Sequence, residues 1–276
     1  MPELPEVETI VRGLSSQLPG RSFRGVDVFH PDLLDESSAS FQARIAESKI
    51  THVGRRGKNI LLSLGDPGVL VVNLGMTGRL LFLGPGDDPV LPTHLALTFP
   101  LAPDGSLLYA DSRRVGRLRI LTPEAWAVES ERLGPEPLGR ALTPARFHGA
   151  LQASRAPIRS WLLDQRRIAG IGNIYAAEAL FRAGVHPFRR ARTLTAPESK
   201  RLLQGIREVL REAIRAQGTT LRDYRTASGT EGEFRQALRV YGREGKPCPT
   251  CKTSVERIVF GNRSAFLCPV CQPKSF

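Results

Sequence analysis

The chain has 276 residues, 41% of them hydrophobic, and a net charge of +12. This length allows one large or two medium domains, and the hydrophobic share is that of a globular protein with a proper core. No apolar run is long enough to span a bilayer and no signal peptide is recognisable, so we exclude an integral membrane protein and expect a soluble intracellular one.

The positive charge is concentrated in the later part of the chain. Residues 1–100 carry nine Lys and Arg against eleven Asp and Glu, whereas residues 101–276 carry 30 against 16. Such an asymmetry indicates a surface that binds a polyanion, and the excess of arginine over lysine suits bidentate contacts with phosphates and bases. A solvated surface encoded by a GC-rich genome is the alternative.

The first residues contain the chemically most informative pattern. Removal of Met1 exposes Pro2, a secondary amine that is followed directly by the carboxyl group of Glu3. An unprotonated terminal amine can attack a sugar carbon or an aldehyde, and a neighbouring carboxyl group can move the protons. The alternative is an ordinary helix start, with Pro5 in the first turn and Glu3 and Glu6 facing the helix dipole.

The apolar pattern then predicts a helix followed by a β-rich region. Apolar residues repeat at helical spacing from Val7 to Leu18, and Pro19-Gly20 is expected to end that helix. Residues 23–121 show short alternating segments separated by turn sequences, which is typical of a sandwich or barrel. The expected strands are 60–64, 69–74, 79–83, 94–99 and 116–121.

The second half of the chain is predicted to be mostly helical. Residues 122–145 contain two helix starts, at Thr122-Pro and Thr143-Pro, and are expected to include a hinge. Thr195-Ala-Pro-Glu198 is a capping box that opens a helix with one apolar face, which Gly218 ends. Residues 219–233, rich in Thr, Gly and Ser, predict a mobile loop.

All four cysteines lie in the last 29 residues, in the pattern C-x2-C-x16-C-x2-C. Each C-x-x-C pair forms a tight turn that aims two thiolates at one point, and the spacing is typical of a tetrahedral zinc site. Residues 254–260 and 264–267 predict a β-hairpin with Arg263 at its tip. Four ligands leave no open position, so we expect a structural zinc ion; two disulfides are the alternative. The expected ligands are Cys248, Cys251, Cys268 and Cys271.

Taken together, the motifs resemble those of the formamidopyrimidine-DNA glycosylase and endonuclease VIII family of base-excision repair enzymes. The resemblance is collinear over nearly the whole chain. It implies an α+β fold with an N-terminal β-sandwich that carries an N-terminal helix, followed by a helix–two-turn–helix domain with a zinc-ribbon β-hairpin. The segments that carry it are Pro2–Thr9, Arg55–Lys58, Leu74–Gly78, Ala169–Tyr175, Val240–Arg243 and the cysteine ribbon. The implied domains are 1–130 (catalytic sandwich), 131–145 (hinge), 146–233 (helical, DNA-binding) and 234–276 (zinc hairpin).

The resemblance also implies roles for individual residues. Pro2 would attack C1′ of a flipped nucleoside and expel the damaged base, with Glu3 as general acid and base, and β,δ-elimination would then cleave the strand. Lys58 and Arg263 would complete the catalytic group by holding the phosphate near the lesion, and Glu6 would support the active site. The other implied DNA contacts are Met76, His94, Arg113, Asn173 and Tyr241, of which Met76 and Arg113 would fill the space left by the extruded base.

Three residues depart from the family pattern. Val115 stands where purine-specific members usually carry phenylalanine, Asn73 where a histidine is common and Arg159 where a lysine is common. Leu4 and the segment 218–224 resemble the formamidopyrimidine branch, which closes this loop over oxidised purines. We therefore expect activity on 8-oxoguanine opposite cytosine and on ring-opened purines. The alternatives are an enzyme for oxidised pyrimidines and a zinc-ribbon protein that binds DNA without cutting it.

Further expectations concern cofactors, partners and location. The resemblance implies one structural Zn²⁺ and no redox cofactor or catalytic metal. The implied partner is double-stranded DNA that contains oxidised bases, bound by a monomer without membrane association. The implied location is the cytoplasm of a bacterium, in association with the nucleoid.

Overall fold

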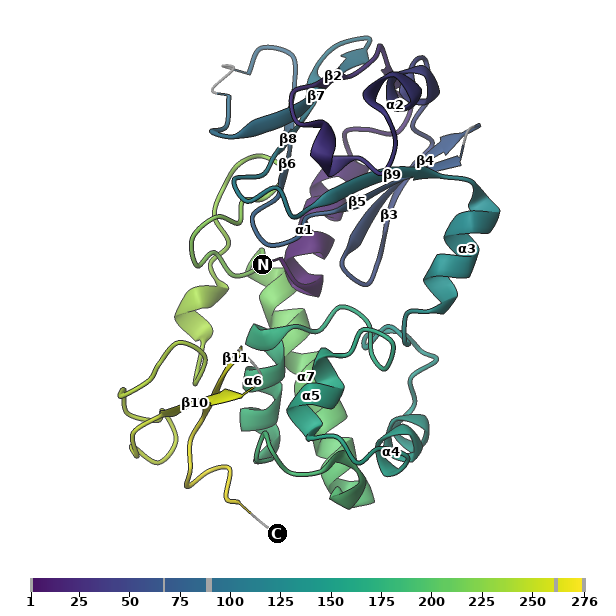
Figure 1. Ribbon diagram of the computed structural model, residues 1–276. Coiled ribbons are helices and arrows are strands. Elements are labelled where there is room, and N and C mark those ends of the chain that lie inside the picture. The colour runs from purple at the N-terminus through teal and green to yellow at the C-terminus, as the bar shows by residue number, and fades with distance from the viewer. Residues whose placement is uncertain (1, 67, 88–90, 261–262, 275–276) are drawn as a thin grey trace. The chain divides into compact units, whose positions relative to one another are not determined.

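The computed structural model describes residues 2–66, 68–87, 91–260 and 263–274 (Figure 1). Its contacts divide the chain into two compact units. Unit 1 comprises Met1–Arg132 and Ile214–Glu233, and unit 2 comprises Leu133–Ala213 and Phe234–Phe276. The expected α+β architecture is confirmed, whereas the boundaries of the four predicted segments stay a prediction.

Unit 1 contains two antiparallel sheets around one apolar core, so the predicted sandwich is present (Figure 1). One sheet has the strand order β3-β4-β5-β9, and the other has β1-β7-β8-β6 with β2 paired to β7. Strand β4 alternates between buried and half-buried positions, as a strand with one face on the core should. The strands are β1 Ser22–Phe23, β2 Asp27–Val28, β3 His52–Arg56, β4 Asn59–Gly65, β5 Gly68–Asn73, β6 Arg79–Leu83, β7 Leu95–Ala102, β8 Ser106–Ala110 and β9 Arg117–Leu121.

Helix α1 (Leu4–Ser15) packs against β3 and β4. Its predicted end was wrong, because the helix ends at Ser15 and not at Pro19-Gly20. The hydroxyls of Ser15 and Ser16 bond back to carbonyls of the preceding turn at 2.7 and 3.0 Å. Serine side chains compete in this way with the backbone ladder, while Leu18 still reaches the core and is fully buried. The other helices of unit 1 are α2 (Ser38–Ile45) and α3 (Pro123–Glu131).

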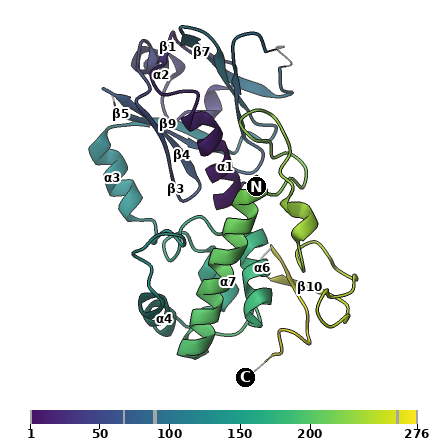
Figure 2. The same cartoon turned by 180° about the vertical axis from the view of Figure 1, so that it is seen from behind.

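Unit 2 consists of helices and one β-hairpin. Figure 2 shows α6 beside α7, and the Arg182–Glu212 ion pair, 2.5 Å at its closest, joins these two helices. Both predicted Thr-Pro helix starts are confirmed, since the hydroxyls of Thr122 and Thr143 cap α3 and α4. No helix among the described residues has the length and apolar character needed to cross a membrane. The elements are α4 Pro144–Gln152, α5 Ile158–Leu163, α6 Asn173–Ala183, α7 Ala196–Arg215, which runs on into unit 1, and the strands β10 Glu256–Phe260 and β11 Arg263–Leu267.

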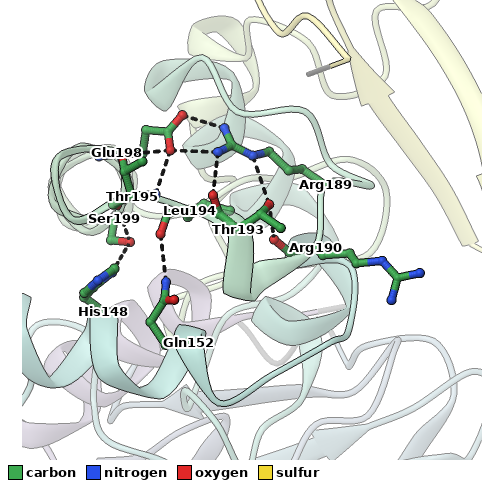
Figure 3. Close-up of polar contacts among 9 residues, drawn as sticks. All are labelled: His148, Gln152, Arg189, Arg190, Thr193, Leu194, Thr195, Glu198 and Ser199. Atoms are coloured by element: carbon green, nitrogen blue, oxygen red, sulfur yellow. Dashed lines mark hydrogen bonds and ion pairs between the residues drawn. The ribbon is translucent and has the colours of Figure 1, made fainter. Parts of the chain in front are cut away.

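The start of α7 shows the predicted capping box (Figure 3). The backbone N–H of Thr195 donates to Glu198 Oε2 at 2.8 Å, and the backbone N–H of Glu198 donates to Thr195 Oγ1 at 3.4 Å. Arg189 binds both oxygens of the same carboxylate, at 2.5 and 2.9 Å. The hydrogen bond from Arg189 lowers the pKa of Glu198 to about 2, and those from Thr195 act in the same direction.

This network predicts a pH-dependent stability. The pKa of Glu198 in the folded state lies below its ordinary value of 4.5. The ionised side chain therefore contributes fully to the stability of the fold above pH 4.5, and this contribution is lost as the pH falls through about 2. Glu198→Gln should therefore lower the free energy of unfolding by about 1 kcal/mol at pH 7, a value discounted for solvent screening. Urea titrations should show this difference shrinking from pH 5 downwards. Glu208→Gln, at an exposed position of the same helix, is the control. A pH-independent difference would contradict this assignment.

Candidate active site and nucleic-acid interface

The N-terminus of α1 gathers buried acidic groups. Glu3 is the N-cap residue, and its backbone N–H donates to Glu6 Oε2 at 2.8 Å in a reciprocal capping box. Pro2 is buried, and Glu3 and Glu6 are only 2% and 1% exposed. The ordinary helix start is thus present as local structure. A helix cap alone does not explain the burial of these carboxyl groups, however. Burial of a charged carboxyl group costs more free energy than an N-cap hydrogen bond contributes. Removal of Met1 would place the amine of Pro2 beside these buried carboxyl groups, an arrangement that suits acid–base and nucleophilic chemistry.

The turn that carries Lys58 is anchored to α1. Arg55 on β3 donates from Nε to Glu8 Oε2 at 3.0 Å and from Nη1 to the carbonyl of Gly57 at 2.9 Å. Burial raises the pKa of Glu8, but hydrogen bonds from Arg55 and Arg12 outweigh it and leave this pKa below its ordinary value. Glu8 therefore stays ionised and holds the β3–β4 turn against α1, the helix that directly follows Pro2 and Glu3.

Asp111 organises two exposed loops of unit 1. Its side chain is 1% exposed and accepts from Thr77 Oγ1 at 2.5 Å and from the backbone N–H of Gly116 at 2.8 Å. These bonds tie the loop 74–78 to the loop 111–116. Sequence reasoning did not identify Asp111, although a single acid directly after an apolar strand and before two arginines is a usable signal.

The tied loops present the residues expected to enter the duplex. Met76 and Val115 are 42% and 45% exposed, and Arg113 is exposed as well. His94, directly before β7, has a positive φ of 63°, and its carbonyl oxygen accepts the backbone N–H of Asp111 at 3.1 Å. The loops thus offer apolar and cationic side chains to solvent on a rigid base, which a wedge that replaces an extruded base requires.

A second cluster, in unit 2, suits a phosphate. Arg159 is 3% exposed, and its Nη2 donates to Asn173 Oδ1 at 2.8 Å and to the carbonyl of Ser264 at 3.0 Å. Asn173 Nδ2 donates to the same carbonyl at 2.9 Å. Burial, and then the charge of Arg263, lower the pKa of Arg159. Both arginines line a pocket of about 290 Å³. Their mutual repulsion would be relieved by an anion that accepts from both.

Glu178 positions the segment that contains Tyr241. The carboxylate is fully buried in α6 and accepts the backbone N–H groups of Arg239, Val240 and Tyr241 at 2.9–3.1 Å. The carboxylate accepts three backbone N–H groups of this turn, which would otherwise need water molecules as acceptors. Sequence reasoning missed Glu178, although it is a lone acid in an otherwise apolar helical stretch.

The cysteine thiols converge as a zinc site requires. All four sulfur atoms lie within 4.8 Å of one another, with Cys248–Cys271 at 3.8 Å and Cys251–Cys268 at 3.4 Å. A tetrahedral ion with Zn–S bonds of about 2.3 Å separates its sulfurs by about 3.8 Å. The residues therefore fit one Zn²⁺. The predicted hairpin is confirmed as β10 and β11. Arg263 is the first residue of β11, and the tip of the hairpin lies outside the described residues.

The residues expected from sequence thus fall into two groups. Those of unit 1 are Pro2, Glu3, Glu6, Lys58, Met76, His94 and Arg113, and those of unit 2 are Asn173, Tyr241, Arg263 and the four cysteines. In the first group Glu6 binds Glu3, and in the second Asn173 binds Arg159, which the sequence had marked only as a departure from the family pattern. Their individual roles stay predictions.

Comparison with known proteins decides the family. Three family models match, described as the formamidopyrimidine-DNA glycosylase N-terminal domain (residues 1–118), its H2TH domain (133–225) and a zinc finger found in FPG and IleRS (245–274). A formamidopyrimidine-DNA glycosylase of Chloroflexus aurantiacus is 43% identical over 99% of this chain and 98% of its own length. The chain belongs to the formamidopyrimidine-DNA glycosylase family. A relative of the same name from Paracoccus denitrificans is 42% identical over 99% of this chain and 100% of its own.

Solved structures of this family have the same fold. A Lactococcus lactis FPG variant in complex with Fapy-dG-containing DNA has a TM-score of 0.91 and 30% identity, and covers 99% of this chain and 100% of its own. The MutM (FPG) protein of Thermus thermophilus has a TM-score of 0.88 and 41% identity with the same coverage. The resemblance and the fold class inferred from the motifs are thereby confirmed.

Replacement of one cysteine should remove the metal. Cys268→Ser loses one of four thiolates, and because the folding energy of such a module comes largely from the ion, zinc content measured by atomic emission should fall from one per chain to well below half. Val270→Ser changes an exposed residue between two ligands and should keep one zinc. Full zinc content in the Cys268 variant would contradict the four-cysteine site.

Proposed function

We propose that this member of the formamidopyrimidine-DNA glycosylase family is a bifunctional base-excision-repair enzyme, a DNA glycosylase and AP lyase for oxidised purines. The proposal rests mainly on the arrangement of the residues at the N-terminus. Pro2 precedes a buried Glu3, and the carboxylate of Glu6 binds the backbone N–H of Glu3 at 2.8 Å. A terminal secondary amine held beside buried carboxyl groups is equipped to form and break an iminium.

The proposed reaction uses only these protein groups. After removal of Met1, the amine lone pair of Pro2 forms a bond to C1′ of the nucleoside, and the bond from C1′ to the base breaks. Glu3 delivers a proton to the opening sugar ring oxygen and later accepts one. The resulting iminium acidifies C2′, so the 3′ phosphate leaves by β-elimination and the 5′ phosphate by δ-elimination. Water then hydrolyses the iminium and restores the free amine.

The basic side chains support the binding of DNA phosphates. Lys58 lies in a turn anchored to α1. In unit 2, the cations Arg159 and Arg263 lie close together, and the neutral amide of Asn173 binds Arg159. In this proposal they hold the backbone on either side of the lesion, while Met76 and the other exposed wedge residues stabilise the gap in the duplex. The proposed partner is double-stranded DNA with oxidised bases, bound by a monomer.

Oxidised pyrimidines are the second candidate substrate. Val115 is 45% exposed and lacks the aromatic ring that could stack on a base pair. Among the similar structures, one Lactococcus lactis FPG complex contains Fapy-dG DNA and another contains DNA with an oxidised pyrimidine, so this fold accepts both. The likeness of the whole chain to formamidopyrimidine-DNA glycosylases favours purines. We further propose a cytoplasmic, nucleoid-associated location in a bacterium.

Substitution of the nucleophile tests the proposal. Pro2→Gly replaces the secondary amine with a primary one and should lower single-turnover excision of 8-oxoguanine opposite cytosine about 1,000-fold or more, with less than a threefold change in Kd for the duplex. Pro5→Ala, which changes the other proline of the helix start, is the matched control and should retain activity. Equal losses in both variants would mean that Pro2 serves only as helix-start structure.

A further inference from the structure

The loops 74–78 and 111–116 of unit 1 meet at a junction of three groups, with the hydroxyl of Thr77 at its centre. Thr77 Oγ1 donates to Asp111 Oδ1 at 2.5 Å and accepts the backbone N–H of Arg113 at 3.2 Å. The same N–H lies 3.2 Å from Asp111 Oδ1, so the three groups are mutually bonded. A hydroxyl can make both bonds at once, because it is a donor to one partner and an acceptor from the other.

Thr77 supplies the hydrogen bonds that cross from one loop to the other. Among the described residues, the other donors to the Asp111 carboxylate are Tyr109, Arg113 and Gly116, which all belong to the same stretch of chain as Asp111. Without the Thr77 hydroxyl this carboxylate would keep those donors and lose its bond to the loop 74–78. The hydrogen bonding between the loops therefore depends on one side chain.

A buried tyrosine supports both loops from the core. Tyr109 of β8 is fully buried, and its hydroxyl lies 3.5 Å from Asp111 Oδ2. A Cβ on Gly116 would lie 1.8 Å from this hydroxyl oxygen and a Cβ on Gly78 2.7 Å from it, so each loop passes directly over the tyrosine. Burial, and then the charge of Asp111, raise the pKa of Tyr109, so the hydroxyl keeps its proton and donates it to the carboxylate.

The loops also touch each other through their backbones. A Cβ on Gly75 would lie 2.7 Å from the backbone nitrogen of Gly116 and 2.9 Å from Val115 Cγ2. The exposed side chain of Val115 thus lies against the loop that carries Met76. Atoms packed this closely transmit a displacement of one loop to the other. Met76, Val115 and Arg113, the residues expected to enter the duplex, therefore have one common base.

The position of this base matters most when the lesion is still paired. Extrusion of a nucleotide costs unstacking and unpairing energy, which is smaller for a base that has already lost its partner. Inserted side chains lower this cost by filling the gap in the duplex. They do so only while both loops hold them in place, so a loosened wedge should slow the removal of a paired base more than that of an unpaired one.

We propose that Thr77 is a positioning residue whose hydroxyl joins the loops 74–78 and 111–116 into one wedge, so that excision of a base-paired lesion, but not of an unpaired one, depends on this junction. The inference rests on the proposed function. Thr77 itself is half-buried beneath the exposed wedge residues and acts through Asp111 and the backbone of Arg113.

Thr77→Val tests the junction, because it removes the hydroxyl and keeps a branched side chain of similar size. Single-turnover excision of 8-oxoguanine opposite cytosine should fall about tenfold. Excision of the same lesion opposite an abasic-site analogue, where it has no pairing partner, should stay within threefold of the wild-type rate. Thr77→Ser keeps the hydroxyl and should retain the wild-type rate on both duplexes.

Thr98→Val is the matched control for the loss of a threonine hydroxyl. Thr98 is half-buried on β7 of the same unit, and its hydroxyl has no hydrogen-bond partner in the part of the chain that the structure describes. This variant should leave both excision rates within twofold of the wild-type values.

A second variant keeps the test independent of the folding of the first. Gly75→Ala retains the Thr77 hydroxyl, but its methyl group pushes against Val115 and Gly116 and should produce the same selective loss. Unchanged excision of the paired lesion by Thr77→Val, equal losses on both duplexes in both variants, or a loss in Thr77→Ser as large as in Thr77→Val would overturn the role of the junction. Wild-type protein without activity on either duplex would instead overturn the proposed function on which this role rests.

Discussion

The structure of the proposed active site depends on one buried carboxylate, that of Glu6. Its side chain is 1% exposed, and its two oxygens accept backbone N–H groups from distant parts of the chain, Glu3 on one and Thr219 on the other. A buried carboxylate without such donors would cost several kcal/mol or become protonated. The need to satisfy this carboxylate therefore holds the start of α1 and residues 217–233 in a fixed relation, next to Pro2, the proposed nucleophile.

Other buried charged groups likewise fix segments of the chain through their hydrogen bonds. Asp111 and Glu178 are buried acids that fix exposed loops through backbone donors, and Arg159 is a buried cation that joins Asn173 to the hairpin strand β11. The zinc site holds the hairpin from which Arg263 and Ser264 project. With four cysteine ligands and no open position, a zinc ion bound there would hold this hairpin in place.

The features that sequence analysis predicted well are local ones. The helix start at Glu3 and Pro5, the capping box at Thr195, the Thr-Pro helix starts and the cysteine spacing all depend on residues a few positions apart. Their chemistry can therefore be recognised from the sequence alone. The end of α1 was misplaced because serine back-bonding ended the helix before Pro19.

The features that sequence analysis missed depend on distant partners. Glu6 and Thr219 are 213 residues apart, and Thr77 and Asp111 are 34 apart. No local pattern indicates which buried acid will meet which backbone donor. For the same reason the sequence predicted only a mobile loop over residues 219–233, and the bonding of Thr219 to Glu6 of α1 emerged only with the structure.

The central claim is that Pro2 forms a covalent bond with DNA, and borohydride trapping tests it most directly. The protein, with removal of Met1 verified by mass spectrometry, is reduced in the presence of a duplex carrying 8-oxoguanine opposite cytosine and, separately, one carrying an oxidised pyrimidine. The account predicts a stable adduct on the purine duplex that peptide mapping places on Pro2. The absence of an adduct on both duplexes, or an adduct on a lysine in place of Pro2, would contradict it.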